Sequence, residues 1–107
     1  MAFTIFLSAD ALDDLKCVTY APEDPATGSA KANRLLDDAC SLGSLPERGR
    51  VLREFRRSDL REIHHGSNRI VYRVNAAEQT VEIVRILLIW TRYRGPDPPD
   101  LPRDWLS

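Results

Sequence analysis

Apolar residues near the N-terminus follow first a strand pattern and then a helical one. The run from Phe3 to Leu7 is rich in aromatic and aliphatic residues and predicts a short first strand. Ser8 is a suitable N-cap, and the apolar residues after it recur three and four positions apart. This spacing predicts a helix from about Ala9 to Tyr20.

A second amphipathic segment follows a break at Pro22. Asp24 can cap a helix that has Pro25 in its first turn, and Gly43 is typical of a helix end. The apolar face of this helix consists of Ala32, Leu35, Leu36, Ala39, Cys40 and Leu42. Two helices joined by a short connection predict a helical hairpin.

After Gly49, apolar and polar residues alternate with a period of two, which is typical of antiparallel strands. We expect strands over residues 51–55, 60–63, 69–74 and 80–90, separated by turns at 56–59, 64–67 and 75–79. The strand over 80–90 is the most apolar of these, so it is predicted to be central in the sheet. Tyr72 shares an apolar face with Ile70 and Val74, which favours a place in the core.

The order of these elements predicts an α+β fold, in which the N-terminal strand and the helical hairpin pack on a small, mainly antiparallel sheet. The helices cover one face of the sheet and the other face stays open. A change of register by one residue moves every side chain of a strand to the opposite face. The sequence therefore leaves open which arginines point outward.

Length and composition indicate one globular domain over residues 1–94, followed by a proline-rich tail over residues 95–107 that ends with the apolar anchors Trp105 and Leu106. No apolar run approaches the ~20 residues of a transmembrane helix. The N-terminus lacks the pattern of a secretion signal, so we expect a cytoplasmic protein. Cys17 and Cys40 are expected to stay reduced and to pack as small apolar groups.

Charge is distributed unevenly along the chain, although the net charge is only −1. Residues 1–46 contain seven acidic and three basic residues, whereas residues 47–73 contain eight arginines and four acidic residues. No lysine occurs after Lys31. Arginine prefers planar, bidentate partners such as phosphate or carboxylate.

This arginine-rich block has two interpretations. The arginines can form a partner-binding surface for an anionic or acidic molecule, with Arg50, Arg53, Arg69, Arg73 and Arg85 as the candidate residues. Alternatively, they can lie on a solvated strand face and pair with glutamates across neighbouring strands.

The order of the motifs resembles that of the RelE/ParE toxins of bacterial type II toxin–antitoxin modules. The resemblance covers residues 1–94. It rests on the opening strand and helix and on three motifs: Pro46-Glu47-Arg48-Gly49-Arg50, Leu60-Arg61-Glu62-Ile63 and Asn68-Arg69-Ile70-Val71-Tyr72-Arg73-Val74. The resemblance implies a cognate antitoxin whose segment folds on the toxin, and a toxin–antitoxin hetero-oligomer. We expect no cofactor, no metal and no membrane partner.

The resemblance also implies two alternative activities. RelE-like toxins cleave mRNA on the ribosome, whereas ParE-like toxins poison DNA gyrase. A metal-free nuclease needs a proton acceptor, a proton donor and cations that stabilise the phosphorane. For such a nuclease the catalytic candidates are Arg61, Arg69, Arg92 and Tyr93, with Arg73 as a further cation.

The sequence lacks a proton acceptor at the position where the resemblance leads us to expect one. The stretch 87–91 contains no histidine, although many family members have one there, and Asn68 replaces the usual aromatic residue before Arg69. His64 and His65 are the remaining bases, and they fall in a predicted turn. As neighbours on a strand they would point to opposite faces, which disfavours a shared metal. A solvated turn is the favoured interpretation for both.

These observations favour a ParE-like toxin that binds and poisons DNA gyrase. The alternative is a RelE-like ribosome-dependent mRNA endoribonuclease. A second alternative is a nucleic-acid-binding domain without toxicity, for which binding would depend steeply on salt.

Overall fold

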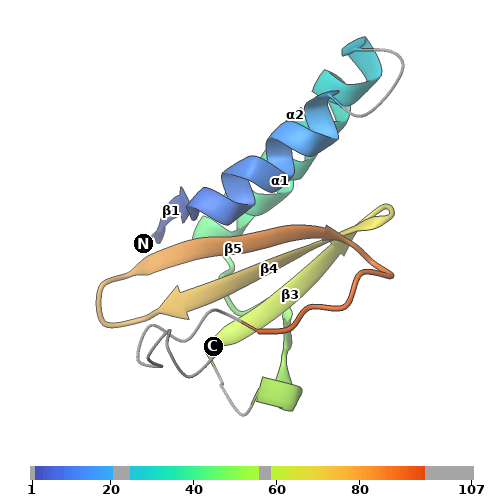
Figure 1. Ribbon diagram of the computed structural model, residues 1–107. Coiled ribbons are helices and arrows are strands. Elements are labelled where there is room, and N and C mark those ends of the chain that lie inside the picture. Colours follow the sequence, from blue (N-terminus) through green and yellow to red (C-terminus); the bar gives the residue numbers. More distant parts are fainter. Residues whose placement is uncertain (1, 21–24, 56–58, 96–107) are drawn as a thin grey trace.

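The computed structural model describes residues 2–20, 25–55 and 59–95 (Figure 1). Its elements, in chain order, are β1 (Thr4–Leu7), α1 (Ala9–Tyr20), α2 (Pro25–Cys40), the 3-10 helix η1 (Ser41–Gly43), β2 (Arg50–Val51), the 3-10 helix η2 (Arg53–Phe55), β3 (Leu60–His65), β4 (Asn68–Asn75) and β5 (Thr80–Leu88). The predicted tail anchors Trp105 and Leu106 and the predicted cap Asp24 lie outside the described residues. Among the described residues, no helix has both the length and the apolar character needed to cross a membrane.

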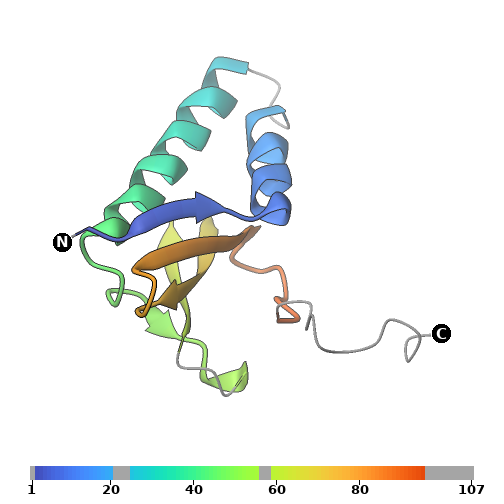
Figure 2. The same cartoon turned by 90° about the vertical axis from the view of Figure 1, so that its left-hand side faces the viewer.

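The described strands form one five-stranded sheet in the order β1-β5-β4-β3-β2. β1 pairs with β5 in parallel, and the other neighbouring pairs are antiparallel. The helical hairpin lies on one side of the sheet, and η2 lies on the other (Figure 2). The predicted α+β architecture is therefore confirmed.

Ser8 connects helix α1 to the sheet. Its Oγ accepts a hydrogen bond from the backbone N–H of Ala11 at 3.0 Å, as an N-cap does, and donates one to the carbonyl of Val84 at 2.8 Å. Farther along α1, Asp14 accepts a hydrogen bond from the N–H of Ile86 at 2.9 Å. Because β1 pairs with β5 only as far as Ile83, these two side chains satisfy backbone groups of β5 beyond β1.

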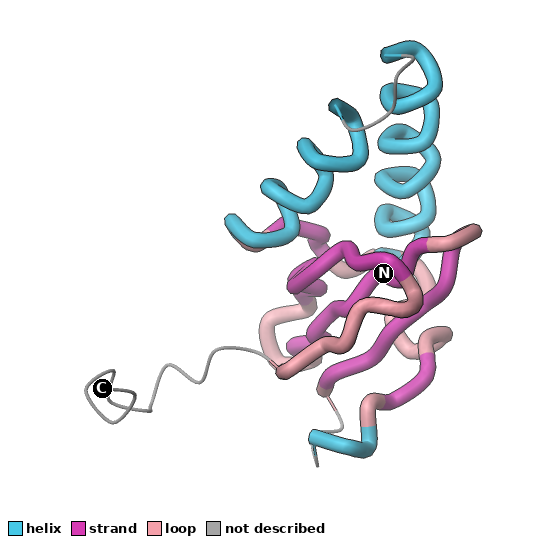
Figure 3. The backbone as a smooth tube through the Cα atoms, turned by 45° about the vertical axis from the view of Figure 1, so that its right-hand side comes forward, coloured by secondary structure: helices cyan, strands magenta, loops and turns pink. Residues whose placement is uncertain are grey.

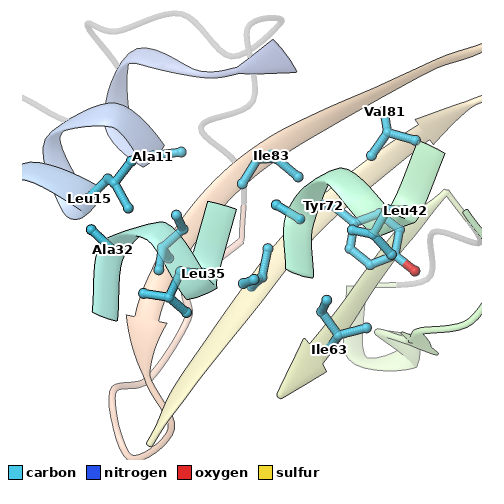
Figure 4. Packing of buried hydrophobic residues seen from close by; sticks show 12 residues of the cluster. Ala11, Leu15, Ala32, Leu35, Leu42, Ile63, Tyr72, Val81 and Ile83 are labelled. Carbon is cyan, nitrogen blue, oxygen red and sulfur yellow. The ribbon is translucent and has the colours of Figure 1, made fainter. Parts of the chain in front are cut away.

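The main core lies between the hairpin and the sheet (Figure 4). The predicted apolar face of α2 supplies Ala32, Leu35 and Ala39, and Leu42 of η1 continues it, all four almost fully buried. The sheet contributes fully buried Tyr72, which confirms its prediction as a core residue. The Tyr72 hydroxyl donates to the carbonyl of Pro46 at 2.8 Å and accepts from the N–H of Gly49 at 2.9 Å.

A smaller apolar cluster lies on the other face of the sheet. It consists of buried Leu52, Leu60, Val71 and Val84, with Phe55 and Tyr93 packed against them. Val84 is an extra residue in β5, since Val71 pairs with Arg85 while Tyr72 pairs with Ile83. This bulge allows β5 to point both Val84 and Arg85 toward this face.

Two of the strand predictions were wrong. The expected strand over residues 51–55 is only the two-residue β2, because Phe55 N–H bonds back to the carbonyl of Leu52 and the chain turns as η2. The strand β5 lies inside the sheet, between β1 and β4, but the middle position belongs to β4, because β3 and β2 both lie beyond it. It ends at Leu88 and not at residue 90, because Thr91 N–H closes a turn onto the carbonyl of Leu88.

The histidine pair and the cysteines also differ from expectation. His64 and His65 belong to β3, and the turn contains Gly66, whose φ of 59° is the left-handed conformation that glycine favours. Cys17 and Cys40 are free, as expected, but both are exposed, so the prediction that they pack as apolar groups was wrong. Cys40 is the last residue of α2 and faces away from the sheet-covering side formed by Leu35 and Ala39.

Candidate functional site: a basic groove on the open face

Strand alternation and register place four arginines on the face of the sheet that the hairpin leaves uncovered. Arg50 pairs in register with Glu62, and Arg73 pairs with Glu82. Arg69 and Arg85 lie on the same face: Arg85 pairs in register with Val71 of the apolar cluster, and Arg69 lies two residues before Val71 on β4. Each of these arginines has a carboxylate partner within the described chain.

Glu62 is the centre of the largest ionic network on this face. Its carboxylate accepts hydrogen bonds from Arg50 at 2.8 Å and from Arg69 at 2.9 Å, and the Nε2 atom of His64 lies 3.3 Å away. Burial opposes ionisation of Glu62, but the hydrogen bonds from the two guanidinium groups outweigh it, so the pKa of Glu62 lies below its ordinary value. Glu62 is therefore an anion that fixes two cations.

Two further pairs anchor the remaining arginines. Arg73 donates from Nε to Glu82 at 3.1 Å and from Nη2 to the same carboxylate. Arg85 donates to both carboxylate oxygens of Asp14 on α1, at 2.7 and 2.9 Å, and this hydrogen bonding raises the pKa of its guanidinium. The bidentate geometry of the Arg85–Asp14 pair is the strong form of an arginine–carboxylate pair.

An open groove of about 870 Å³ lies on this face between η2 and the segment that follows β5. In Figure 3 this segment is the loop that runs back across the strands. The residues that line the groove are Arg50, Leu52, Glu54, Phe55, Arg69, Ile89, Trp90, Thr91, Arg92, Tyr93 and Arg94. We call residues 89–94 the return segment.

The return segment is held firmly against the sheet. The N–H of Ile89 donates to the carbonyl of Ser67 at 2.9 Å, and Arg69 Nη2 donates to the carbonyl of Thr91 at 2.7 Å. The ring of Tyr93 meets that of Phe55 edge to face, with centroids 5.3 Å apart. These contacts fix the backbone from which the exposed side chains of the return segment project.

Arg92 and Arg94 differ from the strand arginines, because the described residues provide neither of them with an acidic partner or a hydrogen bond. Both side chains are exposed. Arg53 in η2 is also exposed and without such a partner in the described chain. Trp90, next to them in the groove, is 70% exposed, which is the largest exposure among the large apolar residues described.

The structure brings together three of the four predicted catalytic residues. Arg69, Arg92 and Tyr93 all line the groove. Arg61 does not, because it pairs in register with Tyr72 on the hairpin side and donates to the carbonyls of Glu47 and Gly49 at 3.0 and 2.8 Å. Of the predicted partner-binding residues, Arg50, Arg69, Arg73 and Arg85 are the paired arginines of the open face, whereas Arg53 has no acidic partner among the described residues.

The two histidines point to opposite faces of β3. His64 lies beside Glu62 on the open face, and its side chain is 59% exposed. His65 lies on the hairpin side, where its Nδ1 is 3.2 Å from Asp38 of α2. Within the described part of the chain, no group of three or more histidine, cysteine or acidic side chains has the arrangement of a metal site.

Sequence reasoning missed Glu62, Trp90 and Arg94. Glu62 could have been found from alternation, since it shares a strand face with Leu60 and His64, and the neighbouring strands β2 and β4 carry Arg50 and Arg69. Trp90 was assigned to the last strand, and its exposure follows from the end of β5 at Leu88. Arg94 lies two positions after Arg92 in the return segment, and both line the groove.

A second, mainly apolar pocket of about 320 Å³ lies between α1, α2 and the end of β5. Its apolar lining comes from Val18 of α1 and from Ile86, Leu87 and Leu88 of β5. Lys31 of α2 and Asp14 of α1 add charge at its rim. This pocket has the dimensions of an anchor site for one or two apolar side chains.

Comparisons with known proteins agree with this geometry. The family model described as the ParE toxin of the type II toxin–antitoxin system parDE matches residues 5–88. No protein of curated function matches the chain by sequence.

Among solved structures, the RelBE2 toxin–antitoxin complex of Mycobacterium tuberculosis contains a similar chain, with 23% identity and a TM-score of 0.66 over 82% of this chain and 99% of that one. A chain of the chromosomal ParDE system of P. aeruginosa has 13% identity and a TM-score of 0.66, over 82% of this chain and 97% of that one. A mutant E. coli RelE toxin in its free state has 20% identity and a TM-score of 0.63, over 84% and 86%. These likenesses show the fold.

Proposed function

Because this chain belongs to the ParE/RelE family of type II toxin–antitoxin toxins, we propose that it inhibits growth by binding and poisoning DNA gyrase. The observation that carries this proposal is the basic groove. Its charged groups are Arg50, Arg69, Arg92, Arg94 and one carboxylate, Glu54. This composition supports binding of an anionic surface more than it supports proton-transfer chemistry.

The same groove is poorly equipped for cleaving RNA. Cleavage requires a group that removes the proton of the 2′-hydroxyl. Arginine stays protonated and cannot do this. The ring of Tyr93 packs against Phe55 and the apolar cluster, and Glu54 is about half exposed at the rim near Arg50. No histidine is among the described residues that line the groove.

We propose that a cognate antitoxin neutralises the toxin, as the RelBE2 and ParDE systems pair a toxin with an antitoxin. A disordered acidic segment that folds on binding can place apolar side chains in the pocket beside Val18 and Leu88. Its carboxylates can then pair with Arg92 and Arg94, for which the described part of the chain provides no acidic partner. The complex would be a hetero-oligomer without cofactor.

The alternative function is ribosome-dependent cleavage of mRNA, and one observation favours it. His64 lies on the open face, in register with Arg69 and within hydrogen-bonding distance of Glu62. Histidine is suited to acid–base catalysis near neutral pH, and an adjacent carboxylate can orient its ring. His64 would then supply the acceptor, with Arg69 and Arg92 stabilising the phosphorane.

Induction in cells, followed by separate readouts, tests these functions. We expect growth arrest, loss of negative supercoiling of plasmid DNA and accumulation of gyrase–DNA cleavage complexes. Purified toxin should inhibit supercoiling by purified gyrase, and His64→Gln should inhibit it equally. Cleavage of mRNA on ribosomes that is abolished in His64→Gln, with gyrase unaffected, would replace the proposal with the alternative. Normal growth on induction would favour a nucleic-acid-binding domain without toxicity.

A further inference from the structure

The apolar pocket between α1, α2 and the end of β5 contains a buried hydrogen-bond acceptor without a partner among the described residues. Asn68, the first residue of β4, helps to line this pocket and is only 2% exposed. Its Nδ2 donates to the carbonyl of Leu87 at 3.3 Å, whereas its Oδ1 is buried and unpaired. We propose that the pocket binds a small apolar molecule that carries one N–H or O–H donor and bonds to Asn68 Oδ1.

The fold fixes the direction in which the amide of Asn68 faces. Asn68 lies two residues before Ile70 on β4, so it shares the hairpin side of the sheet with this core residue. Because the amide N–H group faces the carbonyl of Leu87, Oδ1 is the atom left for a partner. Leu88 pairs in register with Asn68 and is 37% exposed, so a ligand can reach Oδ1 by displacing a side chain that is not locked in the core.

The chemistry of the lining favours an apolar ligand with a single donor. Proteins pair nearly all of their buried polar atoms, because the loss of hydration of an unpaired acceptor is not compensated. A water molecule needs several polar partners to stay in a buried site. Here most of the lining is aliphatic, and the carboxylate of Asp14 is already bonded to Arg85 and to the N–H of Ile86.

The size of the pocket limits the class of ligand. Its volume of about 320 Å³ is near the lower end of the range for ligand pockets, so it suits a molecule of one or two rings and not a nucleotide. Phenols and indoles have the required features, which are a flat apolar ring and one donor at its edge. A hydrocarbon of the same size would fill the pocket but leave Oδ1 unpaired.

This pocket differs from the basic groove in its place and in its partner. It lies between the hairpin and the end of β5, whereas the groove lies on the open face. Binding of a small molecule to the isolated toxin is therefore independent of gyrase. One consequence rests on the proposed function: an antitoxin side chain in the same pocket would exclude the ligand, so the ligand should compete with the antitoxin.

Cys17 reports on occupancy of the pocket, because this exposed, free cysteine is part of the lining. The test uses the purified full chain with indole as the probe, and it measures alkylation of each cysteine by iodoacetamide through peptide mass spectrometry. Indole should slow the alkylation of Cys17 in proportion to its occupancy. Cys40 is the control in the same molecule, since it is also exposed and free but is not among the residues that line the pocket, and its rate should not change.

A matched ligand and a matched variant sharpen the test. 1-Methylindole has the same rings but no N–H donor, so half-protection of Cys17 should require an about 2- to 12-fold higher concentration, as expected for one lost hydrogen bond. Val18→Trp replaces a half-buried lining residue by one that fills the pocket, so it should abolish the protection. A thermal melt checks that this variant is folded, and the comparison of the two ligands on the wild type does not depend on it.

Unchanged alkylation of Cys17 up to the solubility limit of indole overturns the inference. Equal slowing of Cys17 and Cys40 also overturns it, because that result indicates contact with the whole surface. Equal half-protection by indole and 1-methylindole would show that Asn68 Oδ1 does not accept a hydrogen bond from the ligand, and it contradicts the inference as well. Protection of Cys17 without gyrase inhibition would overturn the proposed function alone, and gyrase inhibition without protection would overturn only this inference.

Discussion

The two faces of the sheet are built in different ways. The hairpin face carries the main apolar cluster, and the hydroxyl of Tyr72 inside that cluster both donates and accepts a hydrogen bond. Polar side chains on this face, among them Arg61 and His65, lie around the cluster. The open face has only a small apolar cluster, with arginines around it that are bound to Glu62, Glu82 and Asp14. Charge on the open face therefore contributes first to its own structure. Among the described arginines of this side of the sheet, those without an intrachain partner are Arg53 in η2 and Arg92 and Arg94 in the return segment.

The largest expected effect concerns the hairpin face. Leu35→Ala removes most of a fully buried side chain from between α2 and the sheet, which should lower the free energy of unfolding by about 2–5 kcal/mol. Urea denaturation followed by circular dichroism measures this. The exposed neighbour Arg34→Ala should change it by less than about 0.5 kcal/mol. Equal effects of the two changes would contradict the assigned core.

The next effect concerns the network on the open face. Glu62→Gln removes the negative charge that Arg50 and Arg69 share, and should cost roughly 1.5–3 kcal/mol, the range for hydrogen bonds to charged groups. Because the pKa of Glu62 is lowered in the folded state, its contribution is present above about pH 4.5 and is lost as pH falls below that value.

Unfolding measured as a function of pH checks this prediction. Wild-type stability should fall more steeply than that of Glu62→Gln between pH 4.5 and the acid limit. Parallel curves for the two proteins would mean that Glu62 is not held as an anion by its arginines.

A smaller effect is expected from the hydroxyl of Tyr72. Tyr72→Phe keeps the ring but leaves the buried N–H of Gly49 without a partner, at a cost of about 1–2 kcal/mol. Burial raises the pKa of Tyr72, more than the hydrogen bond from Gly49 lowers it. The folded state therefore favours the neutral phenol, so wild-type stability should decrease above about pH 10, and that part of the decrease should be absent in Tyr72→Phe.

The smallest effect on stability is expected for Arg92→Ala/Arg94→Ala, the variant for which we expect the largest loss of function. Arg92→Ala/Arg94→Ala removes two exposed cations that have no partner in the described chain, so the unfolding free energy should change by less than about 0.5 kcal/mol. A thermal melt measures this. A large loss of stability would show that these arginines support the fold.

Sequence reasoning succeeded where local chemistry decides the structure. The cap at Ser8 and the face of α2 around Leu35 depend on near neighbours, and both were predicted. The position of β5 was not, because its parallel pairing with β1 joins residues far apart in the sequence. Which arginines form ion pairs depends on the register of the strands and on Asp14, an acidic residue of α1. Neither can be read from a local sequence pattern.

The central claim is that partner binding depends on the unpaired arginines of the return segment and not on the paired ones of the sheet. Growth on induction, compared between two double variants with equal expression and similar melting temperatures, tests it most directly. Arg92→Ala/Arg94→Ala should grow normally, whereas Arg73→Ala/Glu82→Ala, which removes one complete ion pair, should still arrest growth. Arrest by the first variant together with normal growth of the second would contradict the account.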